Sequence, residues 1–305
     1  MKKVLISGAS GFVGSKLKKL LGDSNQYNLF YLVRRDPVSD NEIKWDPNRG
    51  LLDSHKLNDI SPDAVINLSG ENISGLWTKS KKDKVYDSRI QGNSLLTHQL
   101  SLLAKPPSVY INATGVSYYG NDVYQPTDEN GKQGTSWFSK VAIDTEKACE
   151  ALKDKSRIVN VRSGIVLDPS GGALHPMLIP FKFGLGGKLG SGKQYMSWVS
   201  LDDITRIYKF ALDNEAIKGG VNGTAPNAVT NKEFTKALGE ALHRPAIIPV
   251  PGFVLNTLLG KEMAGELLLG SQNIYPKKLL DNGFKFNYPT LDQAFDSMFN
   301  NNKNK

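Results

Sequence analysis

The sequence predicts an α/β protein in which a doubly wound parallel sheet is followed by a small, mostly helical C-terminal domain. Three observations support this class. Short apolar segments alternate with helical patterns through the first half of the chain, a glycine-rich turn follows the first apolar segment, and the chain becomes helical in character from Thr230. Strands that alternate with helices form a parallel sheet covered by helices on both faces.

The first strand and helix are expected in "KVLISGASGFVGSKLKKLLG", where an apolar run meets a glycine turn and apolar residues then recur at helical spacing. The other expected strands are apolar along both faces, as strands of a parallel sheet are. They are "YNLFYLVRR", "DAVINLSG", "SVYINATG" and "RIVNVRSGIVL". Helical patterns at 77–104 and 135–152 separate the later ones.

The segment after Asp168, "PSGGALHPMLIPFKFGLGGKLGSGKQ", is rich in glycine and interrupted by proline, so a long irregular arm is expected there. Loops of this length in compact domains are usually functional. The next segment, 195–214, predicts a strand that turns into a helix capped by Asp202 or Asp203.

Two capping boxes predict helices near the C-terminus. Thr230 opens a Thr-x-x-Glu motif and Thr290 a Thr-x-x-Gln motif, and both satisfy backbone N–H groups at the start of a helix. The chain has 305 residues, enough for one large domain and a small appended one. We expect a large domain at 1–235 with the glycine-rich arm at about 169–198, a small C-terminal domain at 236–300, and a disordered tail at 301–305.

Composition argues against several classes of protein. The formal charge is +8, but the lysines are dispersed, and the densest cluster, at 78–84, lacks the aromatic residues of a nucleic-acid surface. The single cysteine, Cys149, excludes an internal disulfide and is expected to be a packed thiol. The four histidines lack the spacing of metal ligands. We therefore expect no nucleic-acid partner and no metal site.

The N-terminal apolar run, Val4 to Ile6, is too short for a signal sequence, and no apolar run approaches the length that spans a bilayer. The sequence thus predicts a cytoplasmic protein without a membrane partner. Its oligomeric state, monomer or homodimer, stays open.

The stretch "SGASGFVG" predicts a dinucleotide site between a strand and a helix. Its glycines let the backbone turn tightly and approach a pyrophosphate, whose charge the helix N-terminus stabilises. An ordinary tight turn is the alternative, but a second strand that ends about twenty residues further on is typical of a nucleotide-binding βαβ unit. The residues expected to contact the cofactor are Gly8, Ser10, Gly11, Phe12, Val13 and Gly14.

The end of the second strand bears on which dinucleotide binds. Arg34 and Arg35 stand where an NAD site places an acidic residue for the ribose hydroxyls. Two guanidinium groups there can hold a 2′-phosphate through charge-assisted hydrogen bonds, which favours NADP over NAD. The alternatives are that both are surface arginines, or that Asp36 binds the ribose in a shifted register.

With these motifs in place, the chain resembles the extended short-chain dehydrogenase/reductases of the NAD-dependent epimerase/dehydratase superfamily, and within it the atypical YfcH-like or SulA-like epimerase family. The motifs "INLSGENI", "SRIQGNSLL", "SYYG", "VRSGIVL" and "PKKLLDNGFKF" follow "SGASGFVG" in the family's order, so the resemblance covers nearly the whole chain. It implies a Rossmann-type domain and further cofactor contacts from Leu68, Ser69, Gly70, Arg89, Ala113, Thr114, Ser163, Gly164 and Val166.

The catalytic pair of that family is missing here. Typical members carry Tyr-x-x-x-Lys, in which the lysine lowers the pKa of the tyrosine and holds the nicotinamide ribose. Glu146 matches the glutamate that follows the lysine by four residues, which leaves Phe138 and Ala142 at the two catalytic positions. Lys140 lies two residues away, on another face of the expected helix.

The remaining catalytic candidates lie in "NATGVSYYG", at the carboxyl end of a strand, where ligands bind in such folds. They are Thr114, Tyr118 and Tyr119, and which tyrosine faces the cleft is left open, as is a core role for one or both. Gln194 and Trp198 on the arm are expected substrate contacts, with loop packing as the alternative.

Two functions follow from these residues. The first is an NADP-dependent oxidoreductase or epimerase that acts on a nucleotide sugar or another small hydroxyl or carbonyl compound. The second is a regulatory or interaction protein that senses NADP(H) without catalysis. Absence of the Tyr-x-x-x-Lys pair favours the second function, and retention of the arm with its polar residues favours the first.

Overall fold

The computed structural model describes residues 1–299 and divides the chain into two compact units. Unit 1 comprises 1–115, 140–162 and 205–221, and unit 2 comprises 116–139, 163–204 and the chain from Asn222 onward. By its contacts, the segment after residue 235 belongs to unit 2 together with earlier parts of the chain. A separate domain at 236–300 stays a prediction, and the expected tail at 301–305 lies outside the described residues.

Unit 1 is built on an eight-stranded sheet with the order β13-β8-β6-β5-β1-β2-β3-β4. β1 pairs in parallel with β2 and β5, β5 with β6, and β2 with β3, while β3 and β4 are antiparallel. The strands are β1 (Lys2–Ser7), β2 (Tyr27–Val33), β3 (Glu42–Asp46), β4 (Leu51–Leu52), β5 (Ala64–Asn67), β6 (Val109–Gly115), β8 (Arg157–Ser163) and β13 (Gly219–Gly223).

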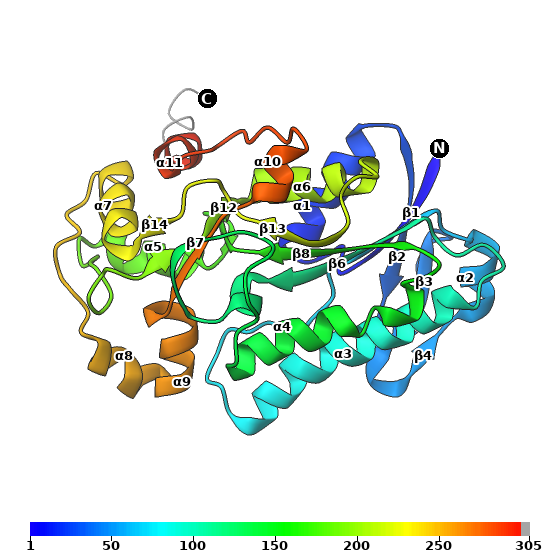
Figure 1. Cartoon of the computed structure of the whole chain (residues 1–305), viewed down its shortest axis with the longest axis horizontal. Coiled ribbons are helices and arrows are strands. Elements are labelled where there is room, and N and C mark those ends of the chain that lie inside the picture. The colour runs from blue at the N-terminus through cyan, green and yellow to red at the C-terminus, as the bar shows by residue number, and fades with distance from the viewer. Residues whose placement is uncertain (300–305) are drawn as a thin grey trace. The chain divides into compact units, whose positions relative to one another are not determined.

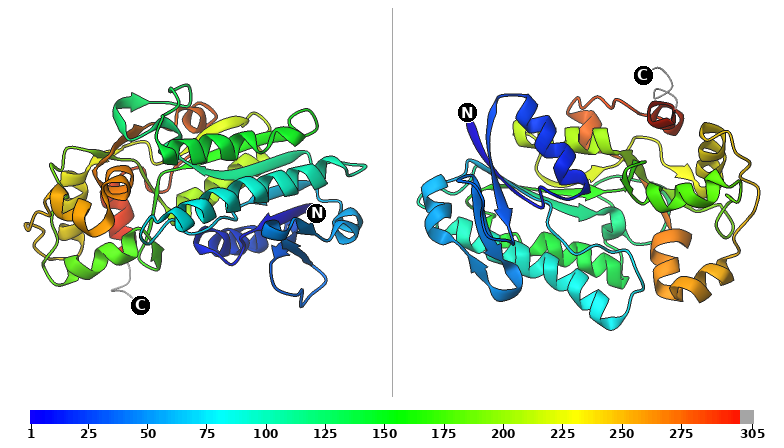
Figure 2. Two further views of the ribbon diagram at one scale, coloured as in Figure 1. Left: turned by 90° about the horizontal axis from the view of Figure 1, so that it is seen from below. Right: turned by 180° about the vertical axis from the view of Figure 1, so that it is seen from behind.

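Helices cover both faces of this sheet. α3 (Lys79–Ser101) and α4 (Trp137–Lys147) lie side by side on one face, and α1 (Phe12–Asp23) and α6 (Leu201–Asp213) lie on the other (Figures 1 and 2). The chain also forms the helix α2 (Ser54–Ile60) and short 3-10 turns at Pro47–Arg49 and Glu150–Leu152. A parallel sheet wound on both faces confirms the Rossmann-type class that the sequence predicts.

The core of unit 1 forms where the buried faces of the strands meet these helices. Val4, Leu5 and Ile6 are fully buried, as expected for a central parallel strand. Leu5 belongs to a hydrophobic cluster that also contains Cys149. This cysteine is buried and free, which confirms the prediction that its thiol is packed in the core, and burial raises its pKa. The larger side chains of this cluster are Leu5, Trp45, Leu57, Leu96, Leu100 and Tyr110.

Unit 2 combines small sheets with short helices. Its sheets are β10-β9-β12, β11-β14 and β15-β7. Its strands are β7 (Asp122–Thr127), β9 (Ile165–Asp168), β10 (Gly171–Gly172), β11 (Tyr195–Met196), β12 (Trp198–Ser200), β14 (Val229–Thr230) and β15 (Ser271–Ile274). Its helices are α5 (Leu174–Lys182), α7 (Asn231–Ala241), α8 (Gly252–Leu259), α9 (Lys261–Ala264), α10 (Lys277–Asp281) and α11 (Leu291–Phe299), with a 3-10 turn at Val116–Tyr119 and a π-helical turn at Gly265–Leu269.

Three local predictions for unit 2 need correction. The arm after Asp168 is not wholly irregular, because it contains α5, which holds Pro180 within its last turn. The strand expected at 157–167 divides at Gly164 into β8 and β9, which belong to different sheets. The cap of α6 is Ser200, whose hydroxyl accepts the backbone N–H of Asp203 at 2.9 Å.

Both predicted capping boxes are confirmed. The Thr230 hydroxyl accepts the Glu233 amide, and the Glu233 carboxylate accepts the Thr230 amide at 2.7 Å. Thr290 and Gln293 exchange the same two hydrogen bonds at longer distances of 3.3 and 3.5 Å. No helix in the described part of the chain is long and apolar enough to cross a membrane. Residues 1–299 also contain no cluster of side chains suited to holding a metal ion.

Candidate nucleotide-binding site

The glycine turn between β1 and α1 accepts no larger residue at two of its positions. Gly8 has a φ of 68°, and a Cβ there would lie 2.9 Å from the carbonyl carbon of Leu68. A Cβ on Gly14 would overlap the carbonyl oxygen of Gly8. The Gly11 amide donates to that same oxygen at 3.0 Å, which closes the turn. The sequence motif therefore reflects real steric limits on this backbone.

The N-terminus of α1 provides an environment suited to an anion. Its N-cap is Gly11, which offers no side-chain acceptor, and its first turn contains no acidic residue. The first amides of a helix carry partial positive charge, which stabilises a nearby phosphate. Around this turn, the predicted contact residues Ser10 and Gly11 are exposed, and Phe12 and Val13 are half-buried.

A buried polar network, which was not predicted from the sequence, holds the ends of β1 and β5 together. Ser7 donates to the side-chain carbonyl of Asn67, which also accepts the Ser69 hydroxyl at 2.7 Å. The Asn67 amide donates to Asn93 on α3 at 3.0 Å and to the Tyr110 hydroxyl at 3.1 Å. The one sequence signal is that Ser7 and Asn67 are polar residues at the ends of apolar strands.

Arg89 on α3 lies against the turn that follows β5. It is half-buried, and one terminal nitrogen, Nη1, donates to the carbonyls of Glu71 (3.1 Å) and Val85 (3.0 Å). A Cβ on Gly70 would lie 3.1 Å from the guanidinium carbon of Arg89. Because Gly70 has no side chain, the guanidinium group of Arg89 can pack closely against its backbone. Burial lowers the pKa of Arg89, and the structure gives it no ion pair among residues 1–299.

The two arginines after β2 are in different situations. The guanidinium of Arg35 forms a two-pronged ion pair with Glu42 on β3, at 2.8 and 2.6 Å. Arg34 is exposed and has no hydrogen bond or ion pair with any residue that the structure describes. Asp36, the alternative ribose ligand, is paired with Lys44 on β3.

Ala113 and Thr114 lie at the carboxyl end of β6, in the same sheet. Both residues are half-buried. The hydroxyl oxygen of Thr114 is itself buried, and within residues 1–299 it has no hydrogen-bond partner. Most buried hydroxyl groups in proteins are hydrogen-bonded, so an unpartnered one marks a position where a ligand can supply the bond.

α4 carries the residues that the sequence resemblance assigns to the catalytic positions of the family. Ala142 is buried, and Phe138 stacks on Trp137 with ring centroids 6.0 Å apart. Lys140 does not replace the missing lysine, because it pairs with Asp144, which also accepts the Tyr86 hydroxyl at 2.8 Å.

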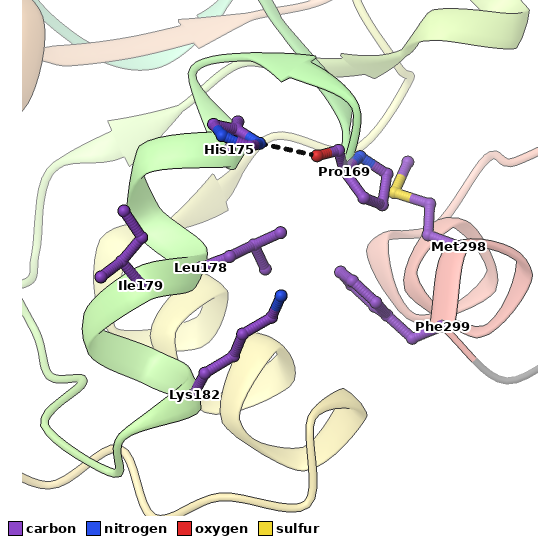
Figure 3. Close-up of a pocket in the computed structure, with 7 residues that line it drawn as sticks. All are labelled: Pro169, His175, Leu178, Ile179, Lys182, Met298 and Phe299. Atoms are coloured by element: carbon purple, nitrogen blue, oxygen red, sulfur yellow. Dashed lines mark hydrogen bonds between the residues drawn. The ribbon is translucent and has the colours of Figure 1, made fainter.

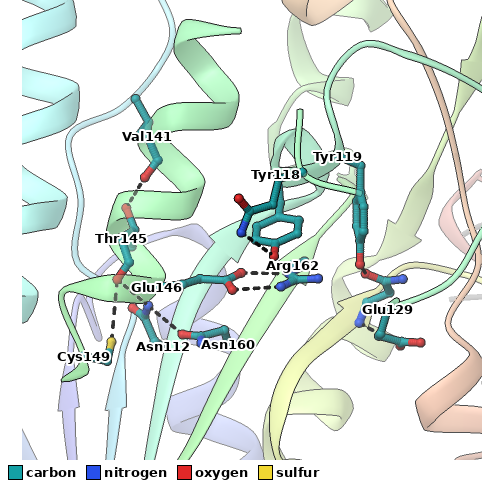
Figure 4. A network of polar contacts seen from close by, with 12 residues as sticks. Asn112, Tyr118, Tyr119, Glu129, Val141, Thr145, Glu146, Cys149, Asn160 and Arg162 are labelled. Atoms are coloured by element: carbon teal, nitrogen blue, oxygen red, sulfur yellow. Dashed lines mark hydrogen bonds and ion pairs between the residues drawn. The ribbon is translucent and has the colours of Figure 1, made fainter. Parts of the chain in front are cut away.

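Glu146, the residue that sets the register of α4, forms an ion pair with Arg162 on β8 (Figure 4). Both hydrogen bonds of this pair are 2.8 Å long. Arg162 is 4% exposed, and a Cβ on Gly220 would lie 2.5 Å from its guanidinium carbon. This glycine is needed because the arginine fills the space above it.

The two candidate tyrosines belong to unit 2, and their hydroxyl groups have different surroundings (Figure 4). Tyr119 is 5% exposed, and its hydroxyl donates to the Asn222 side chain at 2.7 Å. Tyr118 is half-buried, and its hydroxyl accepts from the exposed Gln133 side chain at 2.9 Å. Tyr119 therefore has the contacts of a core aromatic residue, the alternative that the sequence left open.

The two expected substrate contacts on the arm have packing contacts. Gln194 is 3% exposed and donates to the carbonyls of Leu189 (3.1 Å) and Leu268 (3.0 Å). Trp198 is fully buried, and its indole N–H donates to the carbonyl of Asn227 at 3.0 Å. These contacts are those of the loop-packing alternative, and a substrate contact by either residue stays a prediction.

The remaining predicted cofactor contacts, Ser163, Gly164 and Val166, also belong to unit 2. All three are half-buried. A Cβ on Gly164 would lie 2.5 Å from the carbonyl oxygen of Ser197, which explains why the chain changes sheets at a glycine.

Unit 2 also contains a small pocket between α5 and α11 (Figure 3). It measures about 330 Å³, and its lining includes apolar side chains together with His175 and Lys182. None of the predicted cofactor, catalytic or substrate residues lines it. We therefore place the candidate site at the carboxyl edge of the sheet in unit 1.

Comparison with known proteins agrees with this geometry. A model of the NAD dependent epimerase/dehydratase family matches residues 4–222, which include the glycine turn and the whole sheet edge. The chain belongs to this family. Residues 250–298 match a second family model, described as a domain of unknown function (DUF1731).

Relatives in this family match the chain over nearly its full length. "Epimerase family protein Mb2239" of Mycobacterium bovis is 39% identical over 293 residues, which cover 95% of both chains. The human "Epimerase family protein SDR39U1" is 36% identical and covers 96% of this chain and 98% of its own length.

Solved structures of related proteins have a similar fold. Human SDR39U1 (isoform 2), crystallised with NADPH, has a TM-score of 0.88 at 33% identity over 98% of this chain and 99% of its own. A nucleoside-diphosphate sugar epimerase from Corynebacterium glutamicum has a TM-score of 0.80 at 27% identity over 98% of this chain and 58% of its own.

Proposed function

We propose that this chain is an NADP(H)-dependent oxidoreductase or epimerase whose substrate is a small hydroxyl or carbonyl compound, such as a nucleotide sugar. The observation that carries the proposal is the pair of cations at the carboxyl edge of the sheet. Arg34 and Arg89 lie in the same unit as the glycine turn, and neither forms an ion pair within residues 1–299. A polyanionic ligand would supply the ion-pair partner that the structure does not give either guanidinium group.

The residues of this edge fit the parts of NADP(H). The glycine turn and the first amides of α1 suit the pyrophosphate, because they combine close backbone approach with partial positive charge. Arg34 suits the 2′-phosphate, since Asp36, which would favour a ribose hydroxyl, is paired with Lys44. Human SDR39U1, a relative of this chain, was crystallised with NADPH, and this supports NADP(H) as the cofactor here.

Thr114 is the residue that we assign to the reacting group. When bound, NADPH supplies a hydride and NADP accepts one. The buried Thr114 hydroxyl can donate a hydrogen bond to a carbonyl oxygen and so stabilise negative charge that develops there. Of the two tyrosines we assign the second polar role to Tyr118, because the Tyr119 hydroxyl is buried and bonded to Asn222.

A second function, NADP(H) sensing without catalysis, is favoured by one specific observation. α4 presents Phe138 and Ala142 in place of the tyrosine and lysine, and its nearby Lys140 is engaged by Asp144. Without a neighbouring lysine, no cation on α4 helps a phenol to lose its proton, so a tyrosine near these positions is a poor base at neutral pH. Any turnover is therefore expected to be slow. The cytoplasmic location expected from the sequence belongs to this proposal as well.

The test separates binding from catalysis. Calorimetry with NADPH and NADH measures whether the chain binds either nucleotide and which it prefers. NADPH oxidation is then followed with a panel of small carbonyl compounds and nucleotide sugars, for the wild type, Thr114→Ala and Tyr118→Phe. Turnover that falls in both variants while NADPH affinity is kept supports the enzyme. NADPH binding without turnover on any substrate supports the sensor, and absence of nucleotide binding contradicts both functions.

A further inference from the structure

The turn between β2 and β3 contains three successive charged residues, and β3 neutralises two of them. Glu42 pairs with Arg35, and Lys44 pairs with Asp36. Strand pairing fixes this arrangement, because Leu32 lies opposite Ile43 and Val33 opposite Lys44 in a parallel register. Arg34 is the charged residue of this trio that β3 leaves without an ion-pair partner in the described chain.

Glu42 is positioned to organise the turn. It is only 8% exposed, and its carboxylate accepts three hydrogen bonds. Two come from the terminal nitrogens of Arg35, at 2.8 and 2.6 Å, and the third comes from the backbone amide of Val38 at 2.9 Å. One side chain thus holds both the start and the end of the segment 35–38.

Arg35 uses both of its terminal nitrogens within the turn. Its Nη1 donates to Glu42 and also to the backbone carbonyl of Asp36 at 2.8 Å, and its Nη2 donates to Glu42. A two-pronged contact through both terminal nitrogens is already directed at a carboxylate, which leaves the Nε side of this guanidinium for any other anion. Binding a 2′-phosphate through the terminal nitrogens would leave the carboxylate of Glu42, a nearly buried residue, without its partner.

Arg34 has the opposite properties. It is exposed, and it has no hydrogen bond or ion pair with a described residue. The pKa of Glu71, the residue after Gly70, is lowered by the hydrogen bond from Lys81 and, to a smaller extent, by the charge of Arg34. Because Ser7 lies opposite Leu32 in the parallel pairing of β1 and β2, Arg34 follows β2 at the same edge of the sheet as the glycine turn, and no described residue engages its donors.

We propose that Glu42 is a positioning residue for nucleotide specificity, which fixes Arg35 as a structural support of the turn so that Arg34 makes the main contact with the 2′-phosphate. This inference rests on the proposed NADP(H) site and divides its two arginines into different roles. Arg35 then acts through the shape of the turn, and Glu42 acts through Arg35.

The experiment is a comparison of NADPH and NADH affinities by calorimetry at one low ionic strength. Arg34→Gln is expected to lower NADPH affinity roughly 10- to 100-fold, as loss of charge-assisted hydrogen bonds does, and to leave NADH affinity unchanged. Arg35→Gln and Glu42→Gln are each expected to weaken NADPH binding by a smaller factor, about 3- to 10-fold. The Arg35→Gln/Glu42→Gln double variant is expected to have the same NADPH affinity as the single variants, because all three variants remove the same ion pair between Arg35 and Glu42.

Two further variants keep the result decisive if Glu42→Gln folds poorly. Arg35→Lys keeps the charge but loses the two-pronged pair with Glu42, so we expect it to behave as Arg35→Gln does. If Arg35 acted through its charge alone, Arg35→Lys would instead keep an NADPH affinity near that of the wild type, which would contradict its role as a support of the turn. Asp36→Asn, the matched control, breaks the other ion pair to β3 and is expected to change NADPH affinity less than Arg35→Lys does.

The outcomes separate this inference from the function on which it rests. An Arg35→Gln loss larger than that of Arg34→Gln, or tighter NADPH binding by Glu42→Gln, overturns the division of roles while the NADP(H) site stands. A wild type that binds NADPH and NADH equally well overturns the specificity assignment. A wild type that binds neither overturns the site and this inference together.

Discussion

The sheet edge of unit 1 and the arm of unit 2 were both expected to contact ligands, yet their polar groups differ in one physical respect. At the edge, Arg34 and the Thr114 hydroxyl have no hydrogen-bond partner within residues 1–299. On the arm, Gln194 and Trp198 donate to backbone carbonyls of their own unit. Because buried polar groups are nearly always satisfied, the unpartnered Thr114 hydroxyl indicates a position for a ligand, whereas the exposed Arg34 is open to any anion at the edge.

The largest expected effect contrasts two arginines of unit 1. Arg162 is paired with Glu146 inside the protein, and Arg89 has no carboxylate partner in the described chain. Arg162→Met is expected to lower the free energy of unfolding by about 3–5 kcal/mol, because it leaves the Glu146 carboxylate buried without its partner. Arg89→Met should change stability by no more than about 1 kcal/mol while NADPH affinity falls.

Urea unfolding of the ligand-free protein and calorimetry with NADPH measure both quantities. The double variant Glu146→Gln/Arg162→Met is the control, and it should recover part of the stability lost in the single variant. Equal loss of stability in Arg89→Met and Arg162→Met would contradict the distinction between a structural and a ligand-directed arginine.

The second prediction concerns two glycines of the same helix, α1. A Cβ on Gly14 would overlap the Gly8 carbonyl oxygen, whereas a Cβ on Gly22 meets no atom within 4 Å. Gly14→Ala should therefore lower the free energy of unfolding by about 1–3 kcal/mol and weaken NADPH binding, because the turn must shift. Gly22→Ala should raise stability by up to about 1 kcal/mol and leave NADPH binding unchanged.

Thermal unfolding with and without NADPH tests this pair, since bound nucleotide raises the unfolding temperature only if the turn still binds it. A Gly14→Ala protein that gains as much stability from NADPH as the wild type does would show that the glycine turn is structural only.

Much of the fold could be predicted because its signals are local. The apolar runs of β1, β2, β5 and β6 read as buried parallel strands, and the capping box at Thr230 involves residues three positions apart. The division of "RIVNVRSGIVL" at Gly164 could not be predicted, since it depends on distant partners in sheets that form later. α5 was missed because it contains Pro180, and proline in a helix interior usually ends the helix.

The candidate site shows the same limit. The glycine turn follows from backbone sterics that three residues encode, so its geometry could be expected from the motif. The Arg35–Glu42 pair depends on the register of β2 against β3, a strand that sequence patterns did not indicate. Likewise, Tyr118 and Tyr119 are neighbours in a 3-10 turn, and only tertiary contacts show that Tyr119 bonds to Asn222.

The third prediction compares hydroxyl groups of the two units. Tyr119→Phe removes the hydrogen bond to Asn222 and should lower the free energy of unfolding by about 0.5–1.5 kcal/mol without changing NADPH affinity. Thr114→Val removes a hydroxyl that has no partner in residues 1–299, so stability should stay equal or rise, while any turnover falls. Urea unfolding and NADPH oxidation measure the two effects, and a Thr114→Val protein that is less stable but fully active would reverse the assignment.

The smallest expected effect is the pH dependence that Glu42 contributes at the edge of unit 1. Hydrogen bonds from Arg35 and Val38 lower the pKa of Glu42 from its ordinary value of 4.5 to about 2. A carboxyl whose pKa is depressed by folding stabilises the protein above its unfolded pKa, and this contribution is lost as the pH falls from 4.5 towards 2. The stability difference between wild type and Glu42→Gln should therefore be larger at about pH 6 than at about pH 3.

Urea unfolding at both pH values measures this stability difference. Asp36→Asn is the control, because the Asp36 carboxylate is exposed and its ion pair with Lys44 contributes little to stability. If the difference between wild type and Glu42→Gln does not change with pH, the Arg35–Glu42 pair does not hold the turn in solution.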